Sequence, residues 1–121
     1  MSTLFIELRT GNDDLRGDCW ANFYVKLTAD PQPQAFEHFV GGQPRNGRTW
    51  NQVDVPGFIV RSQIEFFQIL HVSVENFPET ADNWDLDLVA IYDDPAAPAL
   101  AVAGPWRFSG DSRLFTFLPN P

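Results

Sequence analysis

The segment from Ser62 to Asp94 constrains the fold more than any other part of this sequence. It contains two long apolar runs, Ile64 to Phe77 and Trp84 to Tyr92, which a short polar link separates. In the first run apolar residues alternate with polar ones, and many are β-branched or aromatic, which is typical of a strand with one buried face. The segment therefore predicts two long strands at the centre of a β fold.

The alternation also predicts which side chains of the first run are buried. Ile64 to Glu75 is expected to be an interior strand, and a shift of one residue in register would exchange its two faces. The residues expected to be buried are Leu70, Val72 and Val74. The residues expected to face solvent are Glu65, His71, Ser73 and Glu75.

Short strands follow one another along the rest of the chain, with turn residues between them. They are expected at Thr3 to Thr10, Trp20 to Thr28, Phe36 to Val40, Arg48 to Val55, Leu100 to Phe108 and Arg113 to Leu118. The first two strands are expected to neighbour each other across the turn Gly11 to Asp18. The strand Arg48 to Val55 is expected to point Trp50 and either Val53 or Val55 inward. About eight strands and no helical period predict an all-β, single-domain antiparallel sandwich of two sheets over residues 1–121, with no helix longer than about two turns.

Composition narrows the classes of partner. Sixteen acidic residues against eight Lys and Arg give a net charge of −8, which repels nucleic acid and anionic lipid surfaces at long range. The single cysteine, Cys19, cannot form an internal disulfide, and no apolar run approaches the ~20 residues of a membrane span. We expect a soluble, cytoplasmic protein, or a secreted one if a leader has been removed; its oligomeric state stays open.

Three pieces of the sequence resemble the PLAT family of β-sandwich domains. They are Leu4 to Leu27, Ile64 to Glu75, and Asp82 to Asp87 with the apolar strand that follows it. In the last piece Trp84 enters that strand after a polar loop, as the family's hallmark tryptophan does. Thr10 to Gly17 (TGNDDLRG) and Asp82 to Asp87 (DNWDLD) are most similar to a bacterial variant of such domains.

The resemblance implies a sandwich of two four-stranded sheets with a non-catalytic role. PLAT domains attach a protein to a lipid, membrane or protein partner, in some members with calcium. The basic or tryptophan-bearing loops of membrane-docking members are not evident in this sequence.

Calcium is the candidate cofactor, because it takes six to eight oxygen ligands from carboxylates and carbonyls that converge from loops. A site requires the loop after Thr10 and the link before Trp84 to share one end of the sandwich. The candidate ligands are Asp13, Asp14, Asp18, Asp82 and Asp85. The alternative is that these aspartates only form turns.

Aromatic residues are the candidate ligand contacts. Trp20, Trp50 and Trp106 can stack on a sugar or insert into a lipid interface. Trp84 is instead expected to be a core anchor at the entrance of its strand.

No residue is predicted to be catalytic. His38 and His71 lie in no recognisable nucleophile or metal motif, and Cys19 is expected to be a small, half-buried apolar side chain. The sequence therefore favours a non-enzymatic module that binds a protein, lipid or glycan through loops at one end of the sandwich. The alternative is a small toxin-like effector or hydrolase with an acidic cleft, and it requires the carboxylates to converge on one cavity.

Overall fold

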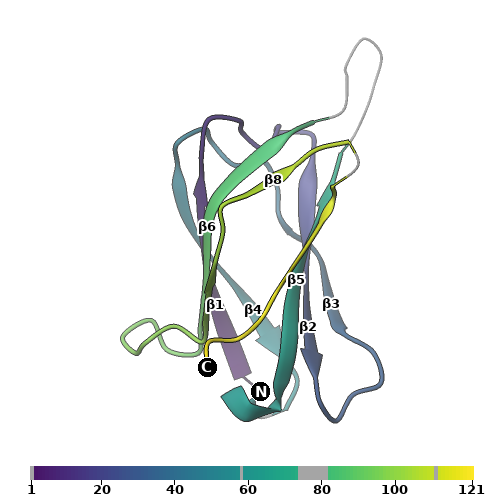
Figure 1. Ribbon diagram of the computed structural model, residues 1–121, viewed down its shortest axis with the longest axis vertical. Coiled ribbons are helices and arrows are strands. Elements are labelled where there is room, and N and C mark those ends of the chain that lie inside the picture. Colours follow the sequence, from purple (N-terminus) through teal and green to yellow (C-terminus); the bar gives the residue numbers. More distant parts are fainter. Residues whose placement is uncertain (1, 58, 74–81, 111) are drawn as a thin grey trace.

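The computed structural model describes residues 2–57, 59–73, 82–110 and 112–121, and it is a sandwich of two antiparallel sheets (Figure 1). One sheet has the order β4-β1-β6-β7, with β8 also paired to β6, and the other has the order β3-β2-β5-β9. The strands are β1 (Ser2–Thr10), β2 (Trp20–Leu27), β3 (Gln34–Val40), β4 (Arg48–Val55), β5 (Ile64–Val72), β6 (Trp84–Tyr92), β7 (Ala101–Ala103), β8 (Trp106–Phe108) and β9 (Leu114–Phe117). A single 3₁₀ turn, η1 (Arg61–Gln63), precedes β5. The predicted all-β sandwich is confirmed.

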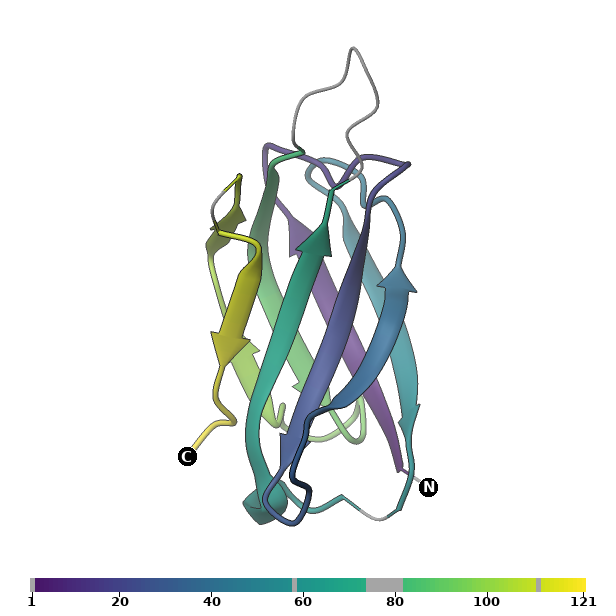
Figure 2. The ribbon, with the colours of Figure 1, turned by 90° about the vertical axis from the view of Figure 1, so that its right-hand side faces the viewer.

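The core lies between the two sheets, whose strands run side by side in Figure 2. Each sheet contributes the apolar face of its central strands, because side chains alternate between the two faces of a strand. Fully buried residues of the five-stranded sheet include Leu4, Ile6, Leu8, Trp84, Leu86 and Ile91. Their fully buried counterparts in the four-stranded sheet are Ala21, Phe23, Val25, Phe67 and Ile69.

The expected pairing of the first two strands is wrong. β1 pairs with β4 and β6, so both of its edges are occupied, and β2 pairs with β3 and β5 in the other sheet. The segment between β1 and β2 crosses from one sheet to the other. Leu15, in the middle of this segment, is buried and forms a bridge with Gln43, which fixes the crossing.

The expected faces of β5 are also wrong beyond its first residues. The register between β2 and β5 shifts between Lys26 and Leu27, which face Phe66 and Ile64, so Glu65 has no partner across the pair. Such a β-bulge exchanges the two faces of the strand that follows it.

Beyond the bulge, the odd-numbered residues of β5 point into the core. Phe67, Ile69 and His71 are buried, whereas Leu70 and Val72 are only partly buried. Of the expected solvent face, Glu65 is exposed, Ser73 is partly buried and His71 is only 2% exposed. Val74 and Glu75 lie outside the described residues.

Two other strand predictions need correction. Trp50 does not point inward: its side chain is 46% exposed, while Val53 and Val55 are buried. In a regular strand residues 50 and 53 lie on opposite faces, so they could not both be buried. The segment Leu100 to Phe108 forms two strands, β7 and β8, which pair with different ends of β6.

Gly104 makes the connection between β7 and β8 possible. Its φ is 110°, which side-chain-bearing residues rarely adopt, and an added Cβ would lie 2.8 Å from the Asp87 carbonyl oxygen. In the part of the chain that the structure describes, no helix has the length and apolar character needed to cross a bilayer.

Candidate functional site

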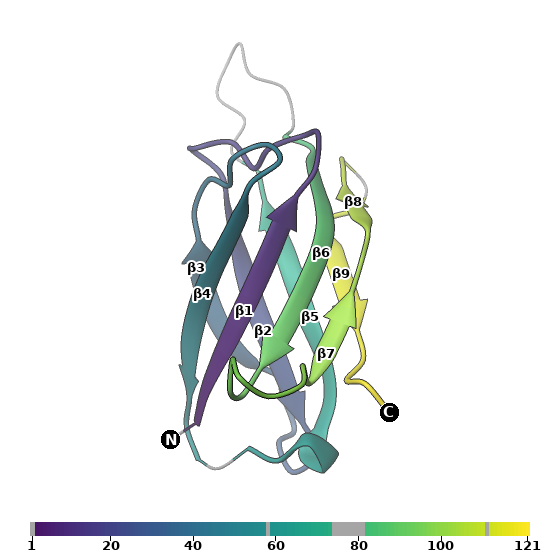
Figure 3. The same ribbon diagram turned by 90° about the vertical axis from the view of Figure 1, so that its left-hand side faces the viewer.

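One end of the sandwich gathers the connections that carry most of the predicted site residues. We call this the loop end and define it as residues 11–19, 41–47, 82–85 and 109–113 without the undescribed residue 111. Backbone hydrogen bonds join its two aspartate-rich segments, from Asp85 N to Asp13 O at 3.0 Å and from Gly11 N to Asp85 O at 2.8 Å. The first and second of the predicted calcium loops therefore do meet, and both chain termini lie toward the opposite end (Figure 3).

Arg107 of β8 occupies the space between two of the predicted calcium ligands. Its guanidinium group contacts Asp13 Oδ2 and Asp85 Oδ1, each at 2.6 Å. These hydrogen bonds, first to Asp13 and then to Asp85, raise the pKa of Arg107 above its usual value. The two carboxylates thus share one counter-charge that the chain itself supplies.

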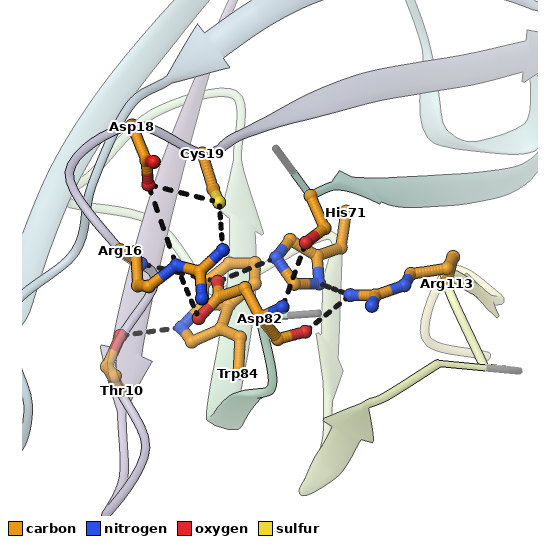
Figure 4. A network of polar contacts seen from close by, with 9 residues as sticks. Thr10, Arg16, Asp18, Cys19, His71, Asp82, Trp84 and Arg113 are labelled. Atoms are coloured by element: carbon orange, nitrogen blue, oxygen red, sulfur yellow. Dashed lines mark hydrogen bonds and ion pairs between the residues drawn. The ribbon is translucent and has the colours of Figure 1, made fainter. Parts of the chain in front are cut away.

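Asp82 is a buried residue of the loop end and lies beside the equally buried His71 (Figure 4). Its Oδ2 atom is 2.9 Å from His71 Nε2 and accepts a hydrogen bond from the Arg16 backbone N–H at 3.3 Å. The Asp82 backbone N–H donates to Ser73 Oγ at 2.8 Å, and Arg16 Nε lies 3.8 Å from Asp82 Oδ1. This carboxylate therefore ties the loop after β1 and the entrance of β6 to the end of β5.

Arg113 determines the protonation of His71. Its Nη1 atom is 2.6 Å from His71 Nδ1 and also donates to the Asp82 carbonyl oxygen at 2.6 Å. An arginine can only donate, so His71 Nδ1 must accept, and the proton of the neutral imidazole lies on Nε2, facing Asp82. Burial lowers the pKa of His71, although the hydrogen bond with Asp82 partly opposes this.

Trp84 completes the buried cluster and confirms the predicted core anchor. It is fully buried, stacks on Phe108 with 5.1 Å between ring centroids, and donates from Nε1 to Thr10 Oγ1 at 3.0 Å. The edges of His71 and Trp84 meet at 6.0 Å between centroids. The tryptophan thus packs the polar network against the apolar core.

Cys19, His71 and Asp82 are the cluster that sequence reasoning missed. They are all buried, and one potential ligand atom of each lies within 4.8 Å of the others. A metal on His71 Nε2 would move the imidazole proton to Nδ1, where it would face the Arg113 donor. The arginines therefore make this a hydrogen-bonded network rather than a metal centre. Only recognition of the β5 bulge, which turns His71 inward, would have revealed it.

The same test applies to calcium. Asp13 and Asp85 are bound to Arg107, Asp82 is bound to His71 and Arg16, and Asp18 Oδ1 is 3.6 Å from Arg16 Nε. Asp14 is exposed. A calcium ion would have to displace guanidinium groups, so the arrangement as it stands does not fit the ion, and calcium binding stays a prediction of the sequence.

The three candidate tryptophans lie on three different surfaces. Trp20 stacks on His38 with 5.0 Å between centroids, on the outer face of the four-stranded sheet. Trp50 lies on the outer face of the other sheet, and Trp106 stacks on Phe115 at the edge between the sheets, with 4.9 Å between centroids. They cannot contact one small ligand together.

Comparison with solved structures places this arrangement among known folds. Crystal structures of deletion variants of a lipoxygenase match 99% of this chain, with TM-scores of 0.66 at 11% identity and, for an anaerobic complex with arachidonate, 0.65 at 12% identity. The matched part is 17% of each lipoxygenase chain. A scan against protein-family models and a search of curated proteins find no match. The structural likeness fits the PLAT-like fold expected from the sequence, and the bacterial variant stays a prediction.

Proposed function

We propose that this chain is a non-catalytic recognition module that binds a protein partner through the loop end. The observation that supports this is the position of Cys19, His71 and Asp82, the groups with catalytic chemistry. All three are buried beneath the loop surface and thus out of reach of a substrate. His71 is hydrogen-bonded to Asp82 and Arg113, and Cys19 is hydrogen-bonded to Arg16 and Asp18. The network fixes the shape of the surface above it, and a surface fixed before binding loses less entropy on association.

The charge of the loop end favours a protein over an anionic lipid surface. Among its described residues, the exposed charged side chains are Asp14, Asp18 and Arg45, which leaves one net negative charge. In a chain of net charge −8, such a rim attracts Lys and Arg side chains and repels anionic headgroups. The partner surface that we infer is therefore basic.

An acidic catalytic cleft is the competing function. It requires the carboxylates to face one cavity, but Asp13 and Asp85 share Arg107 while Asp82 is held separately by His71 and Arg16. This division favours the binding module.

A photo-crosslinking residue in place of Asp14 tests the loop end directly. In the cells that make this protein, we expect it to capture a discrete partner, whereas the same residue in place of the exposed Ala96, at the opposite end, should not. Capture from position 96 alone would contradict the proposed surface. Retention on vesicles of phosphatidylcholine with phosphatidylserine, but not on phosphatidylcholine alone, would show an anionic lipid partner instead.

A further inference from the structure

The outer face of the five-stranded sheet carries a second group of residues, and this group lies outside the loop end. β4, β1 and β6 lie side by side on this face (Figure 3). The strand register sets Glu7 of β1 opposite Trp50 of β4, Arg9 opposite Arg48, and Phe5 opposite Tyr92 of β6. We call Glu7, Arg9, Arg48, Trp50 and Tyr92 the sheet-face cluster.

Glu7 orients two arginines at once. Its side chain is only 5% exposed although it points away from the core, and its Oε2 atom accepts from Arg9 Nε at 3.1 Å and contacts Arg48 Nε. Both arginines contact Glu7 through Nε and not through their Nη groups in the contacts that the structure shows, and their side chains are 52% and 53% exposed. Within the described part of the chain those Nη groups have no hydrogen-bond acceptor.

The charge of the cluster is unusual for this chain. One carboxylate and two guanidinium groups leave a net charge of +1 on a protein of net charge −8. The chain has only eight basic residues, and a single arginine would suffice to pair Glu7. The second guanidinium is available to an external anion.

Two aromatic rings lie beside the arginines. The Arg48 guanidinium lies 5.3 Å from the Trp50 ring centroid, and the Trp50 and Tyr92 rings are 5.4 Å apart and tilted by 42°. Trp50 is 46% exposed. Neither its indole N–H nor the Tyr92 hydroxyl has a hydrogen-bond partner among the described residues. The cluster thus combines ring faces, hydrogen-bonding groups and free arginine donors on an open surface.

We propose that the sheet-face cluster is a binding site for an acidic sugar. The C–H face of a pyranose ring packs on Trp50 and Tyr92, its carboxylate accepts from the Nη groups of Arg9 and Arg48, and its hydroxyls bond with the indole and phenol. The flat position on the outer face of a sheet suits a sugar unit approaching from solvent, and does not suit insertion into a bilayer. This site is independent of the proposed loop-end function.

The test uses a tetrasaccharide of alternating glucuronic acid and N-acetylglucosamine, with binding measured by calorimetry and by amide chemical shifts. We expect saturable binding that weakens as salt is raised, with shifts in β1, β4 and β6. Reduction of the carboxyl groups to alcohols should weaken it at least about tenfold, since hydrogen bonds to charged groups contribute that much or more. Trp50→Ala and Arg48→Gln should each cause a loss of similar size.

Matched variants separate a lost site from a lost fold. Trp106→Ala removes another exposed tryptophan and should bind like the wild type. Arg9→Gln changes a side chain that is half exposed, and it should weaken binding while leaving the melting temperature close to that of the wild type. If Trp50→Ala does not fold, Arg9→Gln and Arg48→Gln still test whether the sheet-face cluster binds the sugar.

Several outcomes of the binding measurements would overturn the proposal. They are no binding at millimolar tetrasaccharide, equal binding of the acidic and carboxyl-reduced forms, tighter binding of acetate or a mononucleotide than of the sugar, and unchanged affinity in the Arg9 and Arg48 variants. A loss of binding confined to variants of the loop end would also contradict it. None of these results bears on the crosslinking experiment at position 14.

Discussion

Burial is the main cause of the lowered pKa of His71, and the arginine donor at Nδ1 also opposes a second proton on the ring. Nε2–H faces Asp82, and Nδ1 accepts from Arg113 at 2.6 Å. Besides these two groups, Arg16 also acts on the ring electrostatically, and burial lowers the pKa of His71 below its usual value of about 6.5. His71 therefore binds a proton less readily in the folded protein than in the unfolded chain.

The first prediction is a loss of stability in mild acid. Above about pH 6.5 His71 is neutral in both states, and its contribution is fully present. As the pH falls below that value the unfolded chain binds the proton first, so the free energy of unfolding decreases by at most about 1.4 kcal/mol per pH unit from this group. Urea unfolding at several pH values between 7.5 and 5.5 measures the slope.

His71→Gln is the control for that slope. The glutamine amide can donate to Asp82 and accept from Arg113, but it does not titrate. We expect this variant to be less stable at neutral pH and to lose less stability than the wild type on acidification. Identical slopes in the two proteins would assign the acid sensitivity to other groups.

Trp84 gives the second prediction. Trp84→Ala removes a fully buried ring that stacks on Phe108 and leaves the Thr10 hydroxyl without its donor. Loss of a large buried aromatic side chain costs about 3 to 5 kcal/mol, a large fraction of the stability of a small domain. Denaturant unfolding should show this loss, and Trp106→Ala, on the surface, should lose much less. A variant that melts like the wild type would place Trp84 outside the core.

At the scale of the elements, hydrophobic alternation predicted most strands and failed at a backbone irregularity. β6 was predicted with its observed bounds, since nine consecutive residues fit one strand. In β5 the residue types on both faces are partly apolar, so alternation does not reveal the bulge at Glu65. The error removed His71 from the predicted core, and with it the connection to Cys19 and Asp82.

The predicted pairing of β1 with β2 was also wrong, and this error too has a physical cause. The turn chemistry between β1 and β2 is that of a hairpin loop, but Leu15 within it is buried and pairs with Gln43. A local turn signal carries no information on which distant strand occupies each edge of β1. Likewise, the aspartates of the loop end were predicted from composition, whereas their arginine partners come from β8, from the residue before β9 or from the same loop.

The third prediction concerns the connection between β8 and the loop end. Arg107 takes the place that a cation would need between Asp13 and Asp85, so Arg107→Gln leaves two carboxylates close together without a counter-charge. We expect a larger rise of melting temperature with millimolar calcium, relative to chelator, in this variant than in the wild type, because an ion that binds the folded state stabilises it.

Two further proteins complete this test. Arg45→Gln removes an exposed arginine of the loop end, for which no carboxylate contact exists among the described residues, and should respond like the wild type. Asp85→Asn combined with Arg107→Gln should abolish the gained response. A strong calcium response in the wild type that Arg107→Gln does not increase would show that the ion binds away from Arg107.

At the scale of the whole molecule, the central feature is which functional side chains are buried and which are exposed. Cys19, His71 and Asp82 lie inside and hold the loops, whereas Trp20, Trp50 and Trp106 lie on separate surfaces. The loop end is acidic and the sheet-face cluster carries a local positive charge. The two proposed sites therefore differ in charge and lie apart, so their proposed ligands would not compete.

The last prediction is that the chain unfolds as one unit. Both sheets bury their apolar faces against a single core, and the loop-end network ties strands of one sheet to strands of the other, as when His71 of β5 bonds Asp82 before β6. Neither sheet can keep its buried face without the other, so unfolding should be two-state. Far-ultraviolet circular dichroism and tryptophan fluorescence should therefore give the same midpoint and slope in urea. Trp84 reports the core and Trp50 the surface of the five-stranded sheet, so a Trp50→Phe variant should keep the coincidence. Two separated transitions would mean that residues 1–121 comprise more than one folding unit.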